Sequence, residues 1–226
     1  MNNFYGGNRG APRLSDTERD RLSAGYGKHL AKELADMRQL QQISSRLILE
    51  NDINQLYNEI LDAAIALMRS DMGSMQMLCP ERNELSLLAW RGFHPQAAEF
   101  WKWVALDSGS TCGKAMRHYS RIHVPDLEIC DFVAGTKDLE YYRLCGIRSV
   151  QSTPLLSREG QLVGMISTHW THVHQPTERD LHLLDVLARQ AADLIERRKA
   201  EIALRESEER LKLAISEVEQ SAFQPR

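Results

Sequence analysis

The sequence has no long apolar run. No stretch reaches the roughly 18 consecutive apolar residues that a membrane-spanning helix needs. The first residues, MNNFYGGNRGAPRLSD, contain no apolar segment able to act as a signal peptide. Neither sign of charge predominates, because the chain has 28 Lys and Arg and 31 Asp and Glu. It also contains no cluster of basic residues that could bind the phosphates of a nucleic acid. We therefore expect a cytoplasmic protein without a membrane span and without a nucleic-acid partner.

Cysteine is scarce and the common catalytic motifs are missing. The four cysteines, Cys79, Cys112, Cys130 and Cys145, form no C-x-x-C pair and are too few for a disulfide framework in 226 residues. The sequence contains neither an H-E-x-x-H zinc motif nor the Ser-centred elbow of α/β-hydrolases. An enzymatic function would therefore have to rest on the cysteines.

Three histidines lie close together in THWTHVHQPTERD, residues 168–180. On a strand, His169 and His172 point to opposite faces. His172 and His174 share a face only if the strand persists, and Pro176 and Thr177 indicate that it is ending. A zinc site needs its ligands to converge on one point. We therefore expect no metal site here, and predict a solvated turn between a strand and a helix.

The periodicity of apolar residues predicts an α+β domain. Helical spacing covers residues 28–49 and 53–70, and the period then changes to that of two hairpins, residues 72–90 and 147–170. Thr177 and Asp180 form a capping box at the start of a final helix without Gly or Pro. We expect an antiparallel sheet with the terminal helices on one face, and a lid of short helices from residues 93–145 on the other.

Four regions are predicted along the chain. Residues 1–15 form a disordered tail and residues 16–50 an N-terminal signalling or dimerisation helix. Residues 51–196 form the sensory domain, and residues 197–226 an output helix and tail. The apolar stripes of the two terminal helices are too long for one domain to cover, so we expect a homodimer through these helices.

A sheet under a lid of short helices provides a pocket for a small molecule. Residues 94–104 are predicted as a short helix with Trp103 turned inward, and aromatic residues are frequent around the lid. The residues that we expect to contact an effector are Trp90, Phe93, Trp103, Cys112, Met116, Tyr141, Ser149 and Gln151. The same aromatic residues are also accounted for by core packing.

Cys112 is the one candidate for thiol chemistry. It lies in the first turn of a short helix capped by Ser110 or Thr111, where the helix dipole favours a thiolate, and Cys145 could approach it through the lid. Cysteine is also among the most buried residue types and often packs as a small apolar group. Both interpretations remain open at this point.

From about residue 34 to 200 the sequence resembles a GAF domain, particularly those of bacterial histidine kinases. The resemblance rests on STCGKAMRHYSRIHVPD, GIRSVQSTPLLSREGQLVGMISTHW and PTERDLHLLDVLARQAADLIERR. The segment ALRESEERLKLAIS is similar to signalling helices that introduce a following PAS or kinase module. The resemblance implies a sensory module of a two-component-type protein that binds a small effector and acts on a downstream signalling module.

Branches of the GAF family differ in their ligands. The cyclic-nucleotide signature is absent, and Cys145 is followed by Gly146 where bilin-binding members have Cys-His, so covalent bilin and cyclic nucleotides are disfavoured. TCGKA, with Cys112, resembles the free methionine sulfoxide reductases, in which Cys145 would be the second cysteine. The cofactor stays unknown, and the reductase and a ligand-free dimerisation scaffold remain as alternatives.

Overall fold

The structure is a computed structural model that describes residues 31, 34–35 and 37–222, with side chains up to residue 215. It divides into two units, one up to Gln41 and one from Gln42 onward. The described residues of the first unit are helical, as are residues 42–49 at the start of the second. The tail predicted for residues 1–15, and the part of the N-terminal helix predicted before residue 31, lie outside the described residues.

A six-stranded antiparallel sheet forms the centre of the second unit, in the order β3-β2-β1-β6-β5-β4. Two local hairpins, β1–β2 and β5–β6, meet along the β1–β6 pair in the middle. Asn83 and Gly160, both with positive φ, lie in the hairpin turns. The strands are β1 (Met72–Cys79), β2 (Glu84–Arg91), β3 (Trp103–Ala105), β4 (Ile122–Val124), β5 (Ser149–Leu156) and β6 (Leu162–Trp170).

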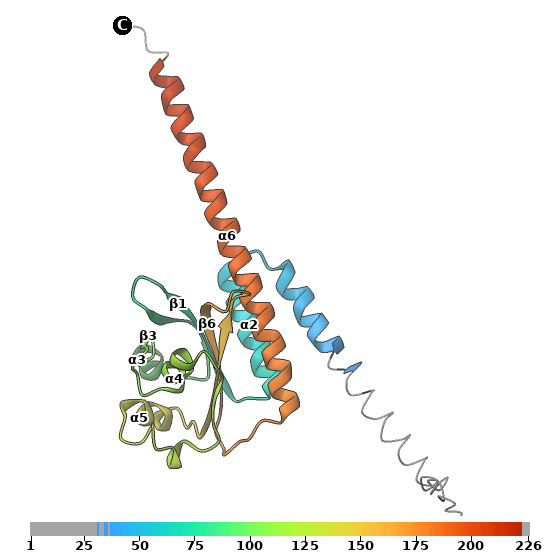
Figure 1. Cartoon of the computed structure of the whole chain (residues 1–226), viewed down its shortest axis with the longest axis vertical. Helices are drawn as coiled ribbons and strands as arrows, with labels where there is room; N and C mark the ends of the chain where they lie inside the picture. Colours follow the sequence, from blue (N-terminus) through green and yellow to red (C-terminus); the bar gives the residue numbers. More distant parts are fainter. Residues whose placement is uncertain (1–30, 32–33, 36, 223–226) are drawn as a thin grey trace, which may run out of the picture. The chain divides into compact units, whose positions relative to one another are not determined.

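Two helices, α2 (Ile53–Met68) and α6 (Glu178–Ala222), lie side by side on one face of the sheet (Figure 1). Asp52 caps α2, its carboxylate accepting from the amide of Asn54 at 2.7 Å. The predicted capping box of α6 is present, since Thr177 Oγ1 accepts from the Asp180 amide at 3.2 Å and the Asp180 carboxylate accepts from the Thr177 amide at 3.2 Å.

Short helices cover the opposite face: α3 (Pro95–Phe100), α4 (Thr111–His118), α5 (Lys137–Leu144) and the 3₁₀ turn η1 (Leu127–Ile129) (Figure 1). This segment is the lid, residues 93–145. Buried apolar side chains of the lid and the sheet form one core between them. The antiparallel sheet, with its terminal helices on one face and its lid on the other, confirms the predicted fold.

The short strand β3 was not predicted. The expected helix over residues 94–104 ends at Phe100, and Trp103 to Ala105 instead pair with β2. A three-residue edge strand leaves almost no periodic signal in the sequence, because its stability comes from the strand beside it. The consequence for the side chains is large, as described below for Trp101 and Trp103.

The last half of α6 leaves the domain. Ile195 is fully buried, whereas every described side chain from residue 199 to 215 is exposed. Arg197–Glu201 and Arg205–Glu209 ion pairs, each four residues apart, run along this half. Within the residues that the structure describes, we find no helix whose length and apolar character would let it span a bilayer.

Candidate ligand site

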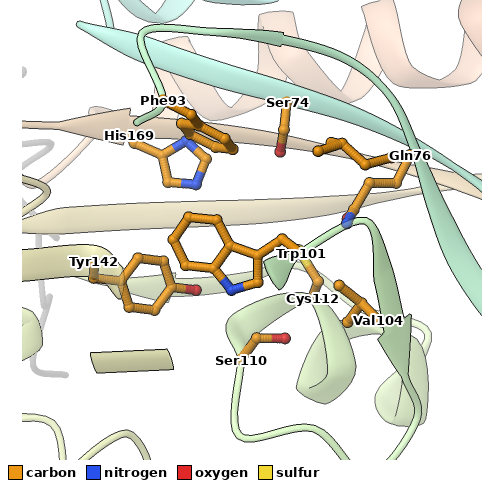
Figure 2. A pocket seen from close by; sticks show the side chains of 10 residues that line it. Ser74, Gln76, Phe93, Trp101, Val104, Ser110, Cys112, Tyr142 and His169 are labelled. Atoms are coloured by element: carbon orange, nitrogen blue, oxygen red, sulfur yellow. The ribbon is translucent and has the colours of Figure 1, made fainter. Parts of the chain in front are cut away.

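A small cavity lies between the lid and the middle of the sheet (Figure 2). Its volume is about 10 Å³, which is room for about one water molecule. Aromatic rings and polar side chains share its wall, which is formed by Ser74, Gln76, Leu87, Phe93, Trp101, Val104, Ser110, Cys112, Tyr142 and His169. The lining has the composition of a small-molecule site, while side chains fill most of the volume that a ligand would need.

His169, on β6, has a buried ring with one nitrogen unsatisfied. The residue is 3% exposed, and Nδ1 has no hydrogen-bond partner. Burial lowers the pKa of His169 to about 3, against the opposing effect of a hydrogen bond to the Met72 backbone. At neutral pH the ring is therefore neutral, and in the tautomer that carries its hydrogen on Nε2 the unpartnered Nδ1 is an acceptor.

Gln76, on the neighbouring strand β1, presents a second unsatisfied group. It is 2% exposed, and its Oε1 has no partner. Figure 2 shows the amide and the His169 ring on the sheet side of the cavity, with Trp101 facing them from the lid. Buried polar atoms are nearly always paired in native proteins, so two unpaired side chains on one cavity wall indicate a place for a polar ligand.

Hydroxyl and thiol groups hold α4 against the sheet below the cavity. Thr111 Oγ1 lies 2.8 Å from Ser152 Oγ, and Ser152 Oγ lies 2.9 Å from Ser167 Oγ. Cys112 Sγ lies 3.2 Å from Ser167 Oγ. These contacts pair the hydroxyl groups of Ser152 and Ser167 and fix the first turn of α4, which Ser110 caps at the Gly113 amide.

Trp101 forms the lid side of the cavity. Its ring lies between Phe93 and Tyr142, with centroid distances of 5.2 and 4.9 Å. Its indole Nε1 donates a hydrogen bond to Asp138 Oδ1 on α5 at 2.9 Å. Asp138 is 6% exposed, and burial raises the pKa of its carboxyl group. One buried hydrogen bond therefore connects the loop after α3 to α5 across the lid.

Acid is expected to destabilise the fold through His169. Its folded-state pKa of about 3 lies below the ordinary value of 6.5. The contribution of the neutral ring to the free energy of unfolding is therefore complete above pH 6.5, and it declines as the pH falls towards 3. At about 1.36 kcal/mol per pK unit, the loss reaches about 2 kcal/mol at pH 5. Urea unfolding at a series of pH values measures it.

Two substitutions make the pH experiment specific. His169→Gln should flatten the decline of unfolding free energy between pH 6.5 and 5, because no ring remains to be protonated. His172→Gln, at a side chain that is 62% exposed, should keep the wild-type profile. Equal slopes in the wild type and in His169→Gln would show that burial of this ring does not govern the acid response.

The structure places two of the predicted effector contacts, Phe93 and Cys112, in the cavity wall. Trp90 is 44% exposed, and Met116 is buried beside a separate hollow lined by Leu106 and Leu162. Tyr141 stacks on Phe100 at 4.1 Å, Ser149 Oγ donates to the Val124 carbonyl, and Gln151 Nε2 donates to Thr153 Oγ1. None of the predicted contacts Trp90, Met116, Tyr141, Ser149 and Gln151 lines the cavity.

The inward orientation predicted for Trp103 is wrong. Trp103 is 37% exposed and carries the guanidinium of Arg82 4.3 Å from its ring centroid, whereas Trp101 is the buried indole. The cause is the unpredicted strand β3. Because residue 103 pairs with β2, its side chain lies on the outer surface. Residue 101 remains at the end of α3, and its side chain faces the core.

Most wall residues were missed because strand parity is ambiguous in the sequence. On β5, Ser152 faces Cys112, so Ser149 and Gln151 point to the other face, under the helices. Every residue of β5 except the last is buried, and no polar alternation marks the cavity side. The available signal was on β1, where Ser74 and Gln76 are polar residues on one face of an otherwise apolar strand.

The three histidines of residues 168–180 separate in space. His169 is buried at the cavity, contrary to the expected surface position, while His172 and His174 stay at the turn with ring centroids 5.6 Å apart. Across the part of the chain with described side chains, no group of three metal-ligating side chains is found.

Three comparisons with known proteins were informative to different degrees. None of the curated proteins matches the chain. Solved structures at 21% identity or below share the fold. A domain assigned to a two-component sensor histidine kinase of Sinorhizobium meliloti is 21% identical, with a TM-score of 0.57, over 69% of this chain and 99% of that one.

Two further structures show the range of proteins with this fold. The GAF domain of a phosphoenolpyruvate-protein phosphotransferase from Coxiella burnetii is 16% identical, with a TM-score of 0.63, over 74% of this chain and 96% of that one. The free methionine-R-sulfoxide reductase of Neisseria meningitidis, in complex with its substrate, is 18% identical, with a TM-score of 0.60, over 75% and 93%. The sequence pattern of the GAF domain matches residues 50–196, and the chain belongs to the GAF domain family.

Proposed function

We propose that this protein is a cytoplasmic sensory module of a two-component-type signalling protein. A small effector binds between the sheet and the lid and changes the packing of α6. The observation that carries the proposal is the pair of buried, unpartnered groups, Gln76 Oε1 and His169 Nδ1, on the wall of an aromatic cavity. The family assignment supports a regulatory role, and the exposed half of α6 provides an output.

The end of β6 supports communication between the cavity and α6. His169 and Trp170 are consecutive and face opposite sides of the sheet, so one lines the cavity while the other, fully buried, lies outside it. The Trp170 ring stacks on His174 with centroids 4.3 Å apart, in the turn that leads to α6. An effector that displaces the end of β6 would therefore move the start of α6, to the extent that it binds one arrangement more tightly.

Native mass spectrometry of the protein purified from its source cells tests effector binding. We expect a noncovalent adduct of one small molecule per chain, lost from a Gln76→Leu variant that removes one polar group of the wall. Trp90→Ala, outside the cavity, is the matched control and should keep the adduct. A wild-type protein that carries no adduct, and gains none from a cell extract, would contradict effector binding and favour the dimerisation scaffold.

The distal half of α6 supports a homodimer. Leu204, Leu211 and Ile215 are 62%, 63% and 50% exposed and follow the seven- and four-residue spacing of a coiled-coil seam. We propose that two copies pair through this seam and pass the signal to a downstream module. Sedimentation velocity at tens of micromolar should show a dimer for the wild type and a monomer for Leu211→Glu. A wild-type monomer would exclude the homodimer.

The reductase alternative has structural neighbours but less support from the site. Cys112 is buried, and burial raises the pKa of its thiol despite hydrogen bonds from Ser152 and Ser167. Cys145 does not line the cavity, and burial also raises the pKa of its thiol. A catalytic cysteine needs an accessible thiolate, so we propose that the module is not an enzyme.

The reactivity of the Cys112 thiol and an assay for methionine sulfoxide reduction together test whether the module is an enzyme. We expect iodoacetamide at pH 8 to leave Cys112 unmodified in the native protein and to label it after denaturation, as read by peptide mass spectrometry. The reduced protein should not consume free methionine sulfoxide. Turnover that Cys112→Ser abolishes, with Cys79→Ser as the matched control, would instead establish the reductase.

A further inference from the structure

The cavity offers hydrogen-bond acceptors and aromatic faces without a positive charge. His169 Nδ1 and Gln76 Oε1 are the unpaired atoms of its wall, and Phe93, Trp101 and Tyr142 supply the rings. Within the described chain, no Lys or Arg side chain lines this cavity. The wall is therefore poorly suited to an anion, and suited to a ligand that brings its own hydrogen-bond donors.

Any occupant larger than a water molecule must displace part of the wall, because the cavity measures only about 10 Å³. Gln76 and His169 stand on β1 and β6, each of which is hydrogen-bonded to strands on both sides. Trp101 belongs to the short connection between α3 and β3 and is joined to the rest of the lid by its hydrogen bond to Asp138. Trp101 is consequently the part of the wall that moves most readily, and the end of β6 follows to a smaller extent.

Displacement of Trp101 would leave a buried carboxylate without its indole donor and with only the hydrogen bond from its own backbone amide. Asp138 Oδ1 accepts from the indole at 2.9 Å, and the residue is 6% exposed. An uncompensated buried carboxylate is costly, and a cation that takes the place of the indole N–H removes that cost. The space that the indole leaves lies between Phe93 and Tyr142, whose ring faces also favour a cation.

We infer that the effector is a small organic cation with a primary ammonium group, which replaces the Trp101 indole as the partner of Asp138. Its hydrocarbon part lies between Phe93 and Tyr142, and Gln76 Oε1 and His169 Nδ1 accept its remaining N–H groups. The inference rests on the proposed effector binding, and it defines the class of effector that this site selects.

The indole N–H signals of the ¹⁵N-labelled full chain give a direct measurement. The Trp101 signal is assigned by its loss in Trp101→Phe. Titration with n-butylammonium chloride, at constant ionic strength, is expected to shift this signal saturably. The isosteric probes n-butanol and sodium butyrate, one neutral and one anionic, should leave it unchanged, and the signal of the exposed Trp90 should not respond to any of the three.

Asp138→Asn isolates the role of charge, because asparagine still accepts from the indole but carries no negative charge. We expect at least tenfold weaker binding of n-butylammonium, with the Trp101 signal still present as proof of folding. Glu140→Gln, an exposed position on the same helix, is the control and should bind as the wild type does.

Three results would overturn the inference. One is a Trp101 response to n-butanol or butyrate that equals the response to n-butylammonium, in which case the site binds small molecules of another class and the proposed function stands. Another is unchanged binding to Asp138→Asn. The third is a Trp101 signal that does not shift with n-butylammonium. Whether any effector binds is decided separately, by the adduct in native mass spectrometry.

Discussion

Trp170→Ala is expected to lower the free energy of unfolding by about 3–5 kcal/mol, the usual cost of truncating a fully buried large aromatic side chain. Trp170 is 0% exposed and is the largest of the fully buried side chains. It lies at the end of β6, where its ring stacks on His174. Alanine at this position leaves a cavity between the sheet and the turn that neither of them can fill. Urea unfolding followed by circular dichroism measures the loss of unfolding free energy.

Trp90→Ala provides the matched control, since it removes an indole of the same size from another strand of the same sheet. Trp90 is 44% exposed, so its removal should cost less than about 1 kcal/mol. A similar loss in both variants would mean that the end of β6 is not closely packed. Retention of wild-type stability by Trp170→Ala would contradict the role of this residue as the anchor of the turn before α6.

Gly164→Ala is expected to destabilise the fold by about 3 kcal/mol, near the upper end of typical overpacking costs. A Cβ on Gly164 would lie 2.4 Å from the backbone carbonyl oxygen of Gln76 on β1. A backbone oxygen in the central strand pair cannot rotate away, so β1 and β6 would have to separate. The expected measurement is a lower urea midpoint with an unchanged dependence on denaturant.

Gly73→Ala is the control for a glycine in the same strand pair. Its Cβ would meet the side chains of Ile65 and Leu61 at 2.8 and 2.9 Å, and these flexible groups can move. We expect a loss of about 1 kcal/mol, the lower end of typical overpacking costs. Equal losses of stability in the two alanine variants would show that the contact with the Gln76 carbonyl oxygen does not limit residue 164.

The consequences of Gly164 extend to the candidate site. The backbone carbonyl of Gln76 leaves no room for a Cβ at residue 164, and the side-chain amide of the same Gln76 lines the cavity. A forced separation of β1 and β6 would therefore shift Gln76 relative to His169. Loss of effector binding in Gly164→Ala should follow from the loss of this alignment.

Local signals in the sequence were sufficient for the order of elements with the exception of β3. The capping box of Thr177 and Asp180, the hairpin turns at Asn83 and Gly160, and the change from helical to strand period all concern residues within a few positions of one another. Such interactions are present in the chain before any tertiary contact forms. The antiparallel sheet, the terminal helices and the lid followed from them.

The candidate site depended on contacts between residues far apart in the chain. Phe93 and Cys112 were predicted, but His169 was placed on the surface and Trp103 was preferred to Trp101. The pairing of β3 with β2 reversed the roles of the two tryptophans. The register of β1 with β6 brought His169 to the same wall as Gln76.

The sequence by itself determined the fold class, the cap of α6 and the membership of the GAF domain family, because each is written in local periodicity or in a contiguous motif. The tertiary structure alone decided which face each strand residue occupies. A strand's two faces are distinguished only by what packs on them, and in β5 and β6 both faces are buried. The site is therefore a product of packing, whereas the fold is already readable in the chain.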